Sequence, residues 1–439
     1  MALLAFVASS LSSSFEAPTA ASGRQIKWPS KTIQIALSTS LTSPSPAFKP
    51  DSDVLGAVHR ALASWSRIAN FTFVEVQSSA ASISPTTKGD GVNLITVAAT
   101  GDNLALFAEG NTTARTRVFY DSDTGEISEA DIVINPYPYS KNGGALQFST
   151  DGTPGTYDLE STLAHEIGHF LGLEHSHVIG ATMQASQALN GTYGLPAITE
   201  RTLSEADETA VRSLYGLREK TGSVEGKILD SIDGNLKAAI GAHVWIEDLE
   251  TGKVVASCLT ASGGRFSINS LAPGNYRAMV EYLDAEVSSA RKVGGRERPF
   301  RSVEIRSRLG VLADKSTSLN YVLVPPQNSP PFLNPRFIGL SGELSTVPVP
   351  VAPGKKLKLY VGGEGVDQIP GTGLVLSSPF MTIDPASLAR EEFYNSTPVV
   401  SFEVTIADNA PPGDYTLRLQ SNTGELAYLV GGVTINPSN

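Results

Sequence analysis

The feature that most constrains this chain of 439 residues is a short run holding three histidines and a glutamate at fixed spacing. His165 and His169 are four residues apart, Glu166 follows the first of them, and His175 comes six residues after the second. Apolar residues recur with helical periodicity through this run, so residues 158–171 are predicted to form a helix. Two histidines one helical turn apart lie on one face, where both can bind the same metal ion.

The residues after this helix extend the same metal site. Gly172 is predicted to let the chain leave the helix through a left-handed conformation, so that His175 returns toward the metal. Three neutral histidines leave the fourth position of a tetrahedral zinc ion open, which is the catalytic rather than the structural arrangement. Glu166 is then placed to accept a proton from water that the metal activates. The alternative is a helix with unrelated histidines, which is disfavoured because three of only six histidines stand at this spacing.

The chain beyond the third histidine resembles the matrixin branch of the metzincin endopeptidases. Ser176 follows the third histidine as it commonly does in matrixins, and Met183 stands at the spacing of their methionine turn. Ala185 occupies the position where astacin-like and serralysin-like relatives carry a tyrosine ligand, which argues against those branches. The resemblance implies a zinc endopeptidase that hydrolyses internal peptide bonds of proteins. It assigns zinc to His165, His169 and His175, the general base to Glu166, and a packing role beneath the metal to Met183.

Further matches to matrixins lie on both sides of the motif. Residues 27–37 resemble the opening strand of that domain, residues 157–161 its entry to the active-site helix, and residues 203–216 its last helix. Asp158 is a plausible N-cap of the active-site helix, and Asp207 is expected to support the methionine turn. The resemblance covers roughly residues 24 to 217 and implies an α+β fold for them.

The remaining histidines are weighed against the three ligands. His177 lies close enough to His175 to compete with it, but the spacing after Gly172 favours His175. His59 is expected on the surface of a helix whose apolar stripe includes Trp65. Many matrixins carry a second, structural zinc, and we expect that site to be missing because His59 is the only histidine between residues 24 and 163.

A cluster of acids at residues 121–126 has two interpretations. Asp121 and Asp123, together with nearby backbone oxygens, could bind calcium. The favoured interpretation is a hairpin turn between segments 117–120 and 127–135, because acids followed by glycine are typical of such turns.

Length, charge and cysteine content limit the remaining possibilities. A chain of this length predicts three domains, and its formal net charge of −11 disfavours nucleic acid or anionic membrane as partners. Cys258 is the only cysteine, so no intrachain disulfide can form, and it is expected to be a small buried side chain. Residues 1–23 are a possible secretory signal or disordered leader, and no segment has the roughly 18 apolar residues of a membrane span. We expect an exported protein, chiefly because the broad-acting endopeptidases that it resembles are rarely safe in a cytoplasm, and we expect it to be monomeric.

After residue 216 the sequence changes to short strands punctuated by Gly and Pro. Residues 222–323 resemble the carboxypeptidase regulatory-like, or transthyretin-like, fold, and residues 332–437 resemble an immunoglobulin-like domain. Residues 324–331 are predicted to form a stiff linker, and His243 is expected to face solvent. The predicted fold class is a multidomain chain, in which an α+β metzincin domain at residues 24–218 precedes two all-β sandwiches. A fragment ending near Arg218 is expected to fold and to cleave small peptides.

The sequence leaves two rival functions open. The metal-binding domain could be inactive in an adhesin or surface-binding protein that acts through its β-sandwiches. The presence of Glu166 beside all three histidines argues against this, since an inactive scaffold has no chemical need for it. A metal-dependent hydrolase of non-peptide substrates is the second rival, which the resemblance of the methionine turn disfavours.

Overall fold

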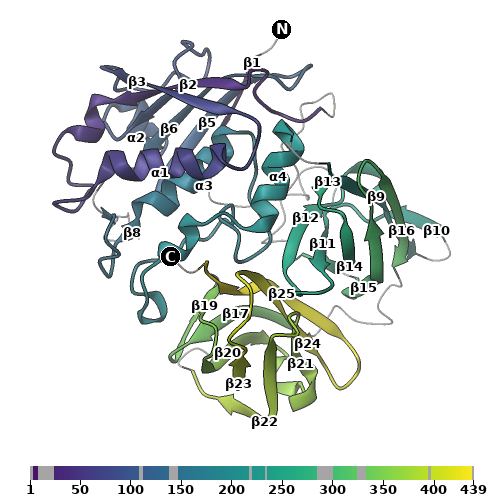
Figure 1. Cartoon of the computed structure of the whole chain (residues 1–439). Helices are drawn as coiled ribbons and strands as arrows, with labels where there is room; N and C mark the ends of the chain where they lie inside the picture. The colour runs from purple at the N-terminus through teal and green to yellow at the C-terminus, as the bar shows by residue number, and fades with distance from the viewer. Residues whose placement is uncertain are drawn as a thin grey trace.

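The computed structural model describes residues 3–7, 24–107, 112–137, 147–216, 220–232, 235–283, 300–323, 333–393 and 397–437. The predicted linker at residues 324–331 lies outside these ranges. The described residues form three parts in sequence order, which Figure 1 shows packed against one another. The first part ends at residue 216, the second spans residues 220–323, and the third spans residues 333–437.

The first part is a mixed sheet with helices, and it contains the histidine motif. Its sheet has the strand order β1-β5-β6-β4-β2-β3, in which β2, β3, β4 and β6 run parallel and β5 pairs antiparallel with β6. Its elements are β1 (Leu3–Val7), β2 (Thr32–Ser38), η1 (Thr39–Thr42), α1 (Val54–Ser66), β3 (Thr72–Ser78), β4 (Leu94–Thr96), α2 (Gly101–Ala105), β5 (Ala114–Asp121), β6 (Ile127–Ile134), β7 (Phe148–Ser149), β8 (Tyr157–Asp158), α3 (Leu159–Phe170), η2 (Thr192–Gly194), η3 (Ile198–Arg201) and α4 (Glu205–Tyr215).

Helices α1 and α3 lie side by side on one face of this sheet (Figure 1). Their apolar faces meet the sheet in one buried cluster. Trp65 of α1 is fully buried there, and its indole N–H donates to the carbonyl of Ala164 in α3 at 2.8 Å. The expected core role of Trp65 is confirmed. His59 lies on the outer side of α1 with its side chain 52% exposed, beside Glu75, which confirms its expected surface position.

Residues 121–126 form the turn between β5 and β6, as the favoured interpretation predicts. The Asp121 carboxylate accepts hydrogen bonds from the backbone amides of Asp123 and Thr124, both at 2.8 Å. Gly125 has a φ of 77°, which suits a residue without a side chain. Residues 3–7 of the possible leader form β1, which pairs antiparallel with β5, so this stretch is an edge strand in the structure.

The second part consists of two four-stranded sheets that enclose an apolar core. In one sheet β9 lies between β10 and β13 and also pairs with β16; the other sheet has the order β12-β11-β14-β15. Cys258 is buried in the core, as expected. The elements of this part are β9 (Gly222–Ile232), β10 (Asn235–Ala238), β11 (Ala242–Asp248), β12 (Val254–Leu259), η4 (Ser262–Gly264), β13 (Arg265–Leu271), β14 (Gly274–Tyr282), β15 (Val303–Val311) and β16 (Ser316–Leu323).

The third part also has two sheets around a core, with the strand orders β18-β17-β20-β23-β22 and β19-β25-β24-β21. Its elements are β17 (Asn334–Leu340), β18 (Glu343–Ser345), β19 (Val349–Val351), β20 (Lys356–Glu364), η6 (Val366–Gln368), η7 (Gly371–Gly373), β21 (Leu374–Leu376), β22 (Met381–Glu391), β23 (Val399–Ile406), β24 (Gly413–Gln420) and β25 (Leu426–Ile435). Among the described helices, none is long and apolar enough to cross a membrane.

The prediction that His243 faces solvent is wrong. Its side chain is fully buried, stacks on Trp245 at 5.3 Å between ring centroids, and contacts Glu281 through Nδ1 and Oε1 at 2.7 Å. The strand does alternate, but both of its faces are covered. One face lines the core of the second part, and the other packs against the first and third parts, so alternation alone could not identify a solvent face.

The three parts share a further apolar cluster where they meet. Val178 of the first part, Trp245 of the second and Tyr428 of the third are all buried in it. Tyr193, from a loop of the first part, is buried in the core of the third part and donates its hydroxyl to the carbonyl of Val347 at 3.0 Å. The two β-rich parts therefore pack directly on the histidine-bearing part.

Candidate metal centre

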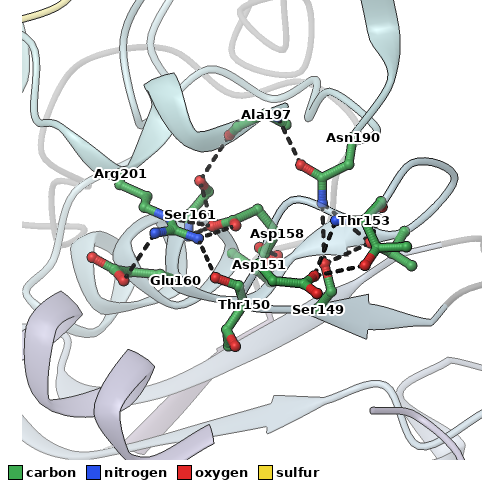
Figure 2. A network of polar contacts seen from close by, with 12 residues as sticks. Ser149, Thr150, Asp151, Thr153, Asp158, Glu160, Ser161, Asn190, Ala197 and Arg201 are labelled. Carbon is green, nitrogen blue, oxygen red and sulfur yellow. Dashed lines mark hydrogen bonds and ion pairs between the residues drawn. The ribbon is translucent and has the colours of Figure 1, made fainter. Parts of the chain in front are cut away.

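The helix that carries the histidine motif begins at a buried, fully hydrogen-bonded cap. Asp158 is the N-cap of α3, accepting from the Ser161 amide at 2.9 Å, as its position in the sequence predicts. Arg201 forms an ion pair with the same carboxylate at 2.6 Å and donates to the carbonyl of Thr150 at 2.9 Å. Figure 2 shows this network, in which Asn190 also holds the amide of Ala197 at 2.7 Å. The network fixes the start of α3 and the loop that follows the motif relative to each other.

The structure brings three of the predicted site residues together at one point. The Nε2 atoms of His165, His169 and His175 lie 3.1, 3.2 and 3.2 Å from one another. The first two come from consecutive turns of α3. The third reaches them because the chain reverses at Gly172, whose φ is 89° and where a Cβ would come within 2.3 Å of the Ile26 carbonyl oxygen.

The other ring nitrogens fix how two of these imidazoles point. Nδ1 of His165 lies 2.8 Å from the carbonyl oxygen of Thr182, and Nδ1 of His169 lies 2.8 Å from that of Leu173. A carbonyl oxygen only accepts, so each Nδ1 carries the proton and each Nε2 presents a lone pair. Within the described residues, Nδ1 of His175 is buried without a hydrogen-bond partner.

This donor set fits a zinc ion. The Nε2 atoms of His165 and His169 both present lone pairs, and lone pairs 3.1 Å apart repel unless a cation lies between them. Nε2 of His175 lies 3.2 Å from one of these atoms and 3.2 Å from the other, so it can bind the same cation. The centre of the triangle lies about 1.8 Å from each nitrogen, close to the usual Zn–N distance of about 2.0–2.1 Å. Burial lowers the pKa of His165 to about 4 and that of His169 to about 3, so both are neutral ligands at physiological pH. Among the described residues, this is the one group of three or more metal-binding side chains.

Glu166 lies beside the histidines and is held by a strand of the sheet. Its carboxylate accepts a hydrogen bond from the hydroxyl of Thr116 in β5 at 2.5 Å, and its side chain is buried. Burial raises the pKa of Glu166 to about 7, although the hydrogen bond from Thr116 acts in the opposite direction. Such a carboxyl group can both take up and release a proton near neutral pH.

Met183 packs directly against α3, the helix that carries His165 and His169. It is fully buried against Gly168, where an added Cβ would come within 2.1 Å of the Met183 sulfur. The amides of Thr182 and Met183 donate to the Asp207 carboxylate at 2.8 and 3.3 Å, and Met183 accepts from the Ser176 amide at 2.7 Å. Asp207 therefore holds this turn, as the sequence suggests.

The other candidates lie apart from this centre. His177 points away from the triad, with its ring centroid 5.6 Å from that of His243. Asp121 and Asp123 belong to the β5–β6 turn described above. Thr116 and Glu200 also belong to the site, although the sequence does not identify them: Thr116 supports Glu166, and Glu200 lines the cavity. No local pattern marks either residue, because each reaches the site only through the packing of the strand or loop that carries it.

Comparisons with known proteins agree with this geometry over the first part. Residues 27–216 match the Matrixin family model. "Metalloendoproteinase 1" of Glycine max is 26% identical over 201 residues, covering 44% of this chain and 53% of that protein. "Interstitial collagenase" of Equus caballus is 28% identical over 171 residues, covering 38% of this chain and 29% of that protein. The chain thus spans about half the length, or less, of these curated relatives.

Solved structures give a weaker comparison. The major pilin subunit BcpA of Bacillus cereus is 11% identical and matches 48% of this chain and 67% of its own length, with a TM-score of 0.19. A score this low does not establish a shared fold. The family match and the histidine cluster together support a matrixin-like metallopeptidase region within a multidomain chain.

Proposed function

We propose that this chain is a zinc-dependent endopeptidase that hydrolyses internal peptide bonds of proteins. The observation that carries the proposal is the convergence of three histidine Nε2 atoms at 3.1–3.2 Å next to the buried carboxylate of Glu166. His165, His169 and His175 would bind the zinc, and Met183 would pack beneath it. The match of residues 27–216 to matrixins supports peptide bonds as the substrate class.

In this proposal Glu166 moves the proton. When bound, zinc supplies Lewis-acid polarisation of the scissile carbonyl and makes water more acidic. The carboxylate of Glu166 takes the proton from the attacking water and later delivers it to the leaving amine. Thr116 holds one carboxylate oxygen at 2.5 Å, which leaves the other oxygen to take the proton. A divalent cation nearby favours the ionised form of Glu166, opposing the effect of burial on its pKa.

The proposal extends to the architecture of the whole chain. An α+β metzincin domain at residues 24–218 would be followed by a carboxypeptidase regulatory-like β-sandwich at 222–323 and an immunoglobulin-like β-sandwich at 332–437. The paired sheets around separate cores support two sandwiches. Substrates would be proteins or peptides, and the protein would act as an exported monomer.

The alternative is an adhesin whose metal centre is inactive. Direct packing of the β-rich parts onto the histidine-bearing part supports a shared structural role for them. That packing does not explain why a buried carboxylate lies beside three metal-binding nitrogens, whereas peptide hydrolysis requires a carboxylate at this position.

Substitution of Glu166 by Gln separates proton transfer from metal binding. Gln can still accept the hydrogen bond from Thr116, but it cannot accept a proton at neutral pH. We expect the variant to fold and to retain zinc while kcat falls by about 10² to 10⁴-fold with little change in KM. His169→Ala should lose the metal as well, because it removes one of three ligands.

Turnover of a casein-derived peptide and zinc content, measured on the same preparations, decide the matter. Glu126→Gln, an exposed residue of the β5–β6 turn, is the matched control and should behave as the wild type. Near-normal turnover in the Glu166 variant would eliminate this mechanism. A zinc-loaded wild-type protein that cleaves no peptide would favour the adhesin.

A further inference from the structure

The cavity beside the three histidines has an unusual lining for a pocket that receives substrate. Thr162, Thr182, Gln187 and other short polar or small side chains form its wall together with the triad and Glu166. One further carboxylate, that of Glu200, also lines it. Among the described residues that line the cavity there is no Lys, no Arg and no large apolar side chain. Substrate-binding pockets are usually mainly apolar, so this lining indicates selection for a polar group.

Glu200 is anchored to the metal-binding residues through the segment that ends at Met183. Its backbone carbonyl accepts from the Thr182 hydroxyl at 3.4 Å, and the Thr182 carbonyl in turn holds Nδ1 of His165 at 2.8 Å. One oxygen of its carboxylate accepts from the Ala188 amide at 3.2 Å. Glu200 therefore has a fixed position relative to the catalytic centre.

Two acids near Glu200, Asp158 and Glu160, are paired with arginine, but Glu200 itself is not. Arg201 forms an ion pair with Asp158 at 2.6 Å, and Arg60 forms one with Glu160 at 2.7 Å (Figure 2 shows the first of these). In the described parts of the chain, no basic side chain forms an ion pair with Glu200. Burial raises its pKa to about 8, and the nearby charge of Asp158 acts in the same direction. A carboxylate in such a place is stabilised by any cation that enters the cavity.

We propose that this cavity receives the side chain of a substrate residue next to the cleaved bond, and that Glu200 makes lysine the preferred residue there. The inference rests on the proposed peptidase function and names the substrate class of the same site. The cavity has a volume of about 40 Å³, so the compact ammonium group of lysine suits it better than the larger planar guanidinium of arginine. The lysine ammonium would pair with Glu200, while Thr162 and Gln187 offer further oxygens along the wall.

Other side chains are disfavoured for stated physical reasons. An apolar side chain would displace water from Glu200 and the hydroxyl groups without replacing its hydrogen bonds. An acidic side chain would be repelled by Glu200. The preference is therefore a property of one carboxylate, and a single substitution tests it.

The experiment uses the full-length, zinc-loaded protein and two peptide series. The first series varies the residue immediately before the cleaved bond, and the second varies the residue immediately after it. In each series this residue is either lysine or norleucine, which has a similar length but no charge. We expect kcat/KM for lysine to exceed that for norleucine by at least about tenfold in one series at pH 8.5. In Glu200→Gln the ratio should fall to within about twofold of one. Glu126→Gln, an exposed control that removes the same charge elsewhere, should keep the wild-type ratio.

The outcomes separate this inference from the function on which it rests. Cleavage of both peptides at equal rates by the wild type, or a lysine preference that persists in Glu200→Gln, would overturn the inference and leave the peptidase intact. Cleavage of neither peptide would overturn both. Zinc content and the thermal unfolding midpoint of Glu200→Gln show whether the variant keeps the site, since Gln retains the acceptor for the Ala188 amide.

Discussion

The backbone amide of Ile179 donates a hydrogen bond to the carbonyl of Val430 at 2.7 Å. Ile179 lies in the segment between His175 and Met183, and Val430 lies in β25, the last strand of the chain. The segment that completes the metal centre is thus bonded directly to the C-terminal part. The expectation that a fragment ending near Arg218 keeps a working site overlooks this contact, because no sequence pattern links residues 251 positions apart.

Gly180→Ala tests this dependence in the intact chain. An added Cβ at residue 180 would come within 2.1 Å of an Asp414 carboxylate oxygen and 3.0 Å of the Gly431 carbonyl oxygen. We expect the segment to shift away from the third part and zinc affinity to fall by about 10- to 100-fold, as for other groups that support metal ligands. Competition with a chromogenic chelator measures this affinity. Gly310→Ala, which meets nothing within 4 Å, is the control, and equal affinity in both variants would contradict the prediction.

Gly168→Ala should disturb the metal centre from below. A Cβ at this position would lie 2.1 Å from the Met183 sulfur and 3.0 Å from a ring carbon of Trp65. Overpacking of this kind costs about 1–3 kcal/mol, more than the gain of about 1 kcal/mol from replacing a helical glycine. We expect a lower thermal unfolding midpoint and weaker zinc binding. Gly101→Ala in α2, where nothing lies within 4 Å, should be neutral or slightly stabilising; a similar result for Gly168→Ala would show that Met183 repacks freely.

Metal removal should abolish peptidase activity and lower stability together. Zinc binds the folded site far better than the unfolded chain, so one equivalent should raise the thermal unfolding midpoint and a chelator should reverse the rise. Elemental analysis of the purified protein should give close to one zinc per chain, since one set of three ligands is formed by the described residues. Two tightly held zinc ions would contradict the expectation that the structural zinc site is missing.

The local features of the site were predictable from sequence, whereas the contacts that tie it to the rest of the chain were not. Helix α3, its Asp158 cap and the left-handed Gly172 follow from periodicity and turn chemistry within one segment. Thr116 reaches Glu166 only because β5 packs across α3, and Glu200 reaches the cavity only because the loop after Met183 folds back. Such positions depend on packing between distant segments, which a single sequence does not encode in any local pattern.

Glu281→Gln should change how stability depends on pH. Burial against His243 raises the pKa of Glu281 from the usual 4.5 to about 8 in the folded protein. The folded state therefore binds this proton more tightly than the unfolded state, and this contribution is fully present below about pH 4.5 and lost as pH rises through 8. Gln can still pair with Nδ1 of His243 but does not titrate.

The difference in unfolding free energy, variant minus wild type, should rise between pH 6.5 and 8.5, by on the order of 2 kcal/mol. This window lies above the range in which His243 titrates, because burial lowers its pKa to about 3 in the folded protein from 6.5. Chemical denaturation at a series of pH values measures the difference. Glu225→Gln, on an exposed position of β9, should show no such trend, and a flat difference for Glu281→Gln would mean that its carboxyl group is not desolvated.

The preference for lysine should itself depend on pH. Burial raises the pKa of Glu200 to about 8, so its carboxyl group is largely neutral at pH 6.5 and largely ionised at pH 9 in the empty cavity. The charged groups around it are Asp158, paired with Arg201, and Glu166 with the three histidines. Lysine stays protonated over this range, since its usual pKa is about 10.4. The ratio of kcat/KM for lysine to that for norleucine should therefore rise several-fold between pH 6.5 and 9. Titration of Glu166 acts on both substrates and cancels in the ratio, whereas bound zinc favours the ionised form of Glu200 and shifts the rise toward the lower end of this pH range. A ratio that does not vary with pH, or one that rises equally in Glu200→Gln, would show that a group other than Glu200 recognises the lysine ammonium.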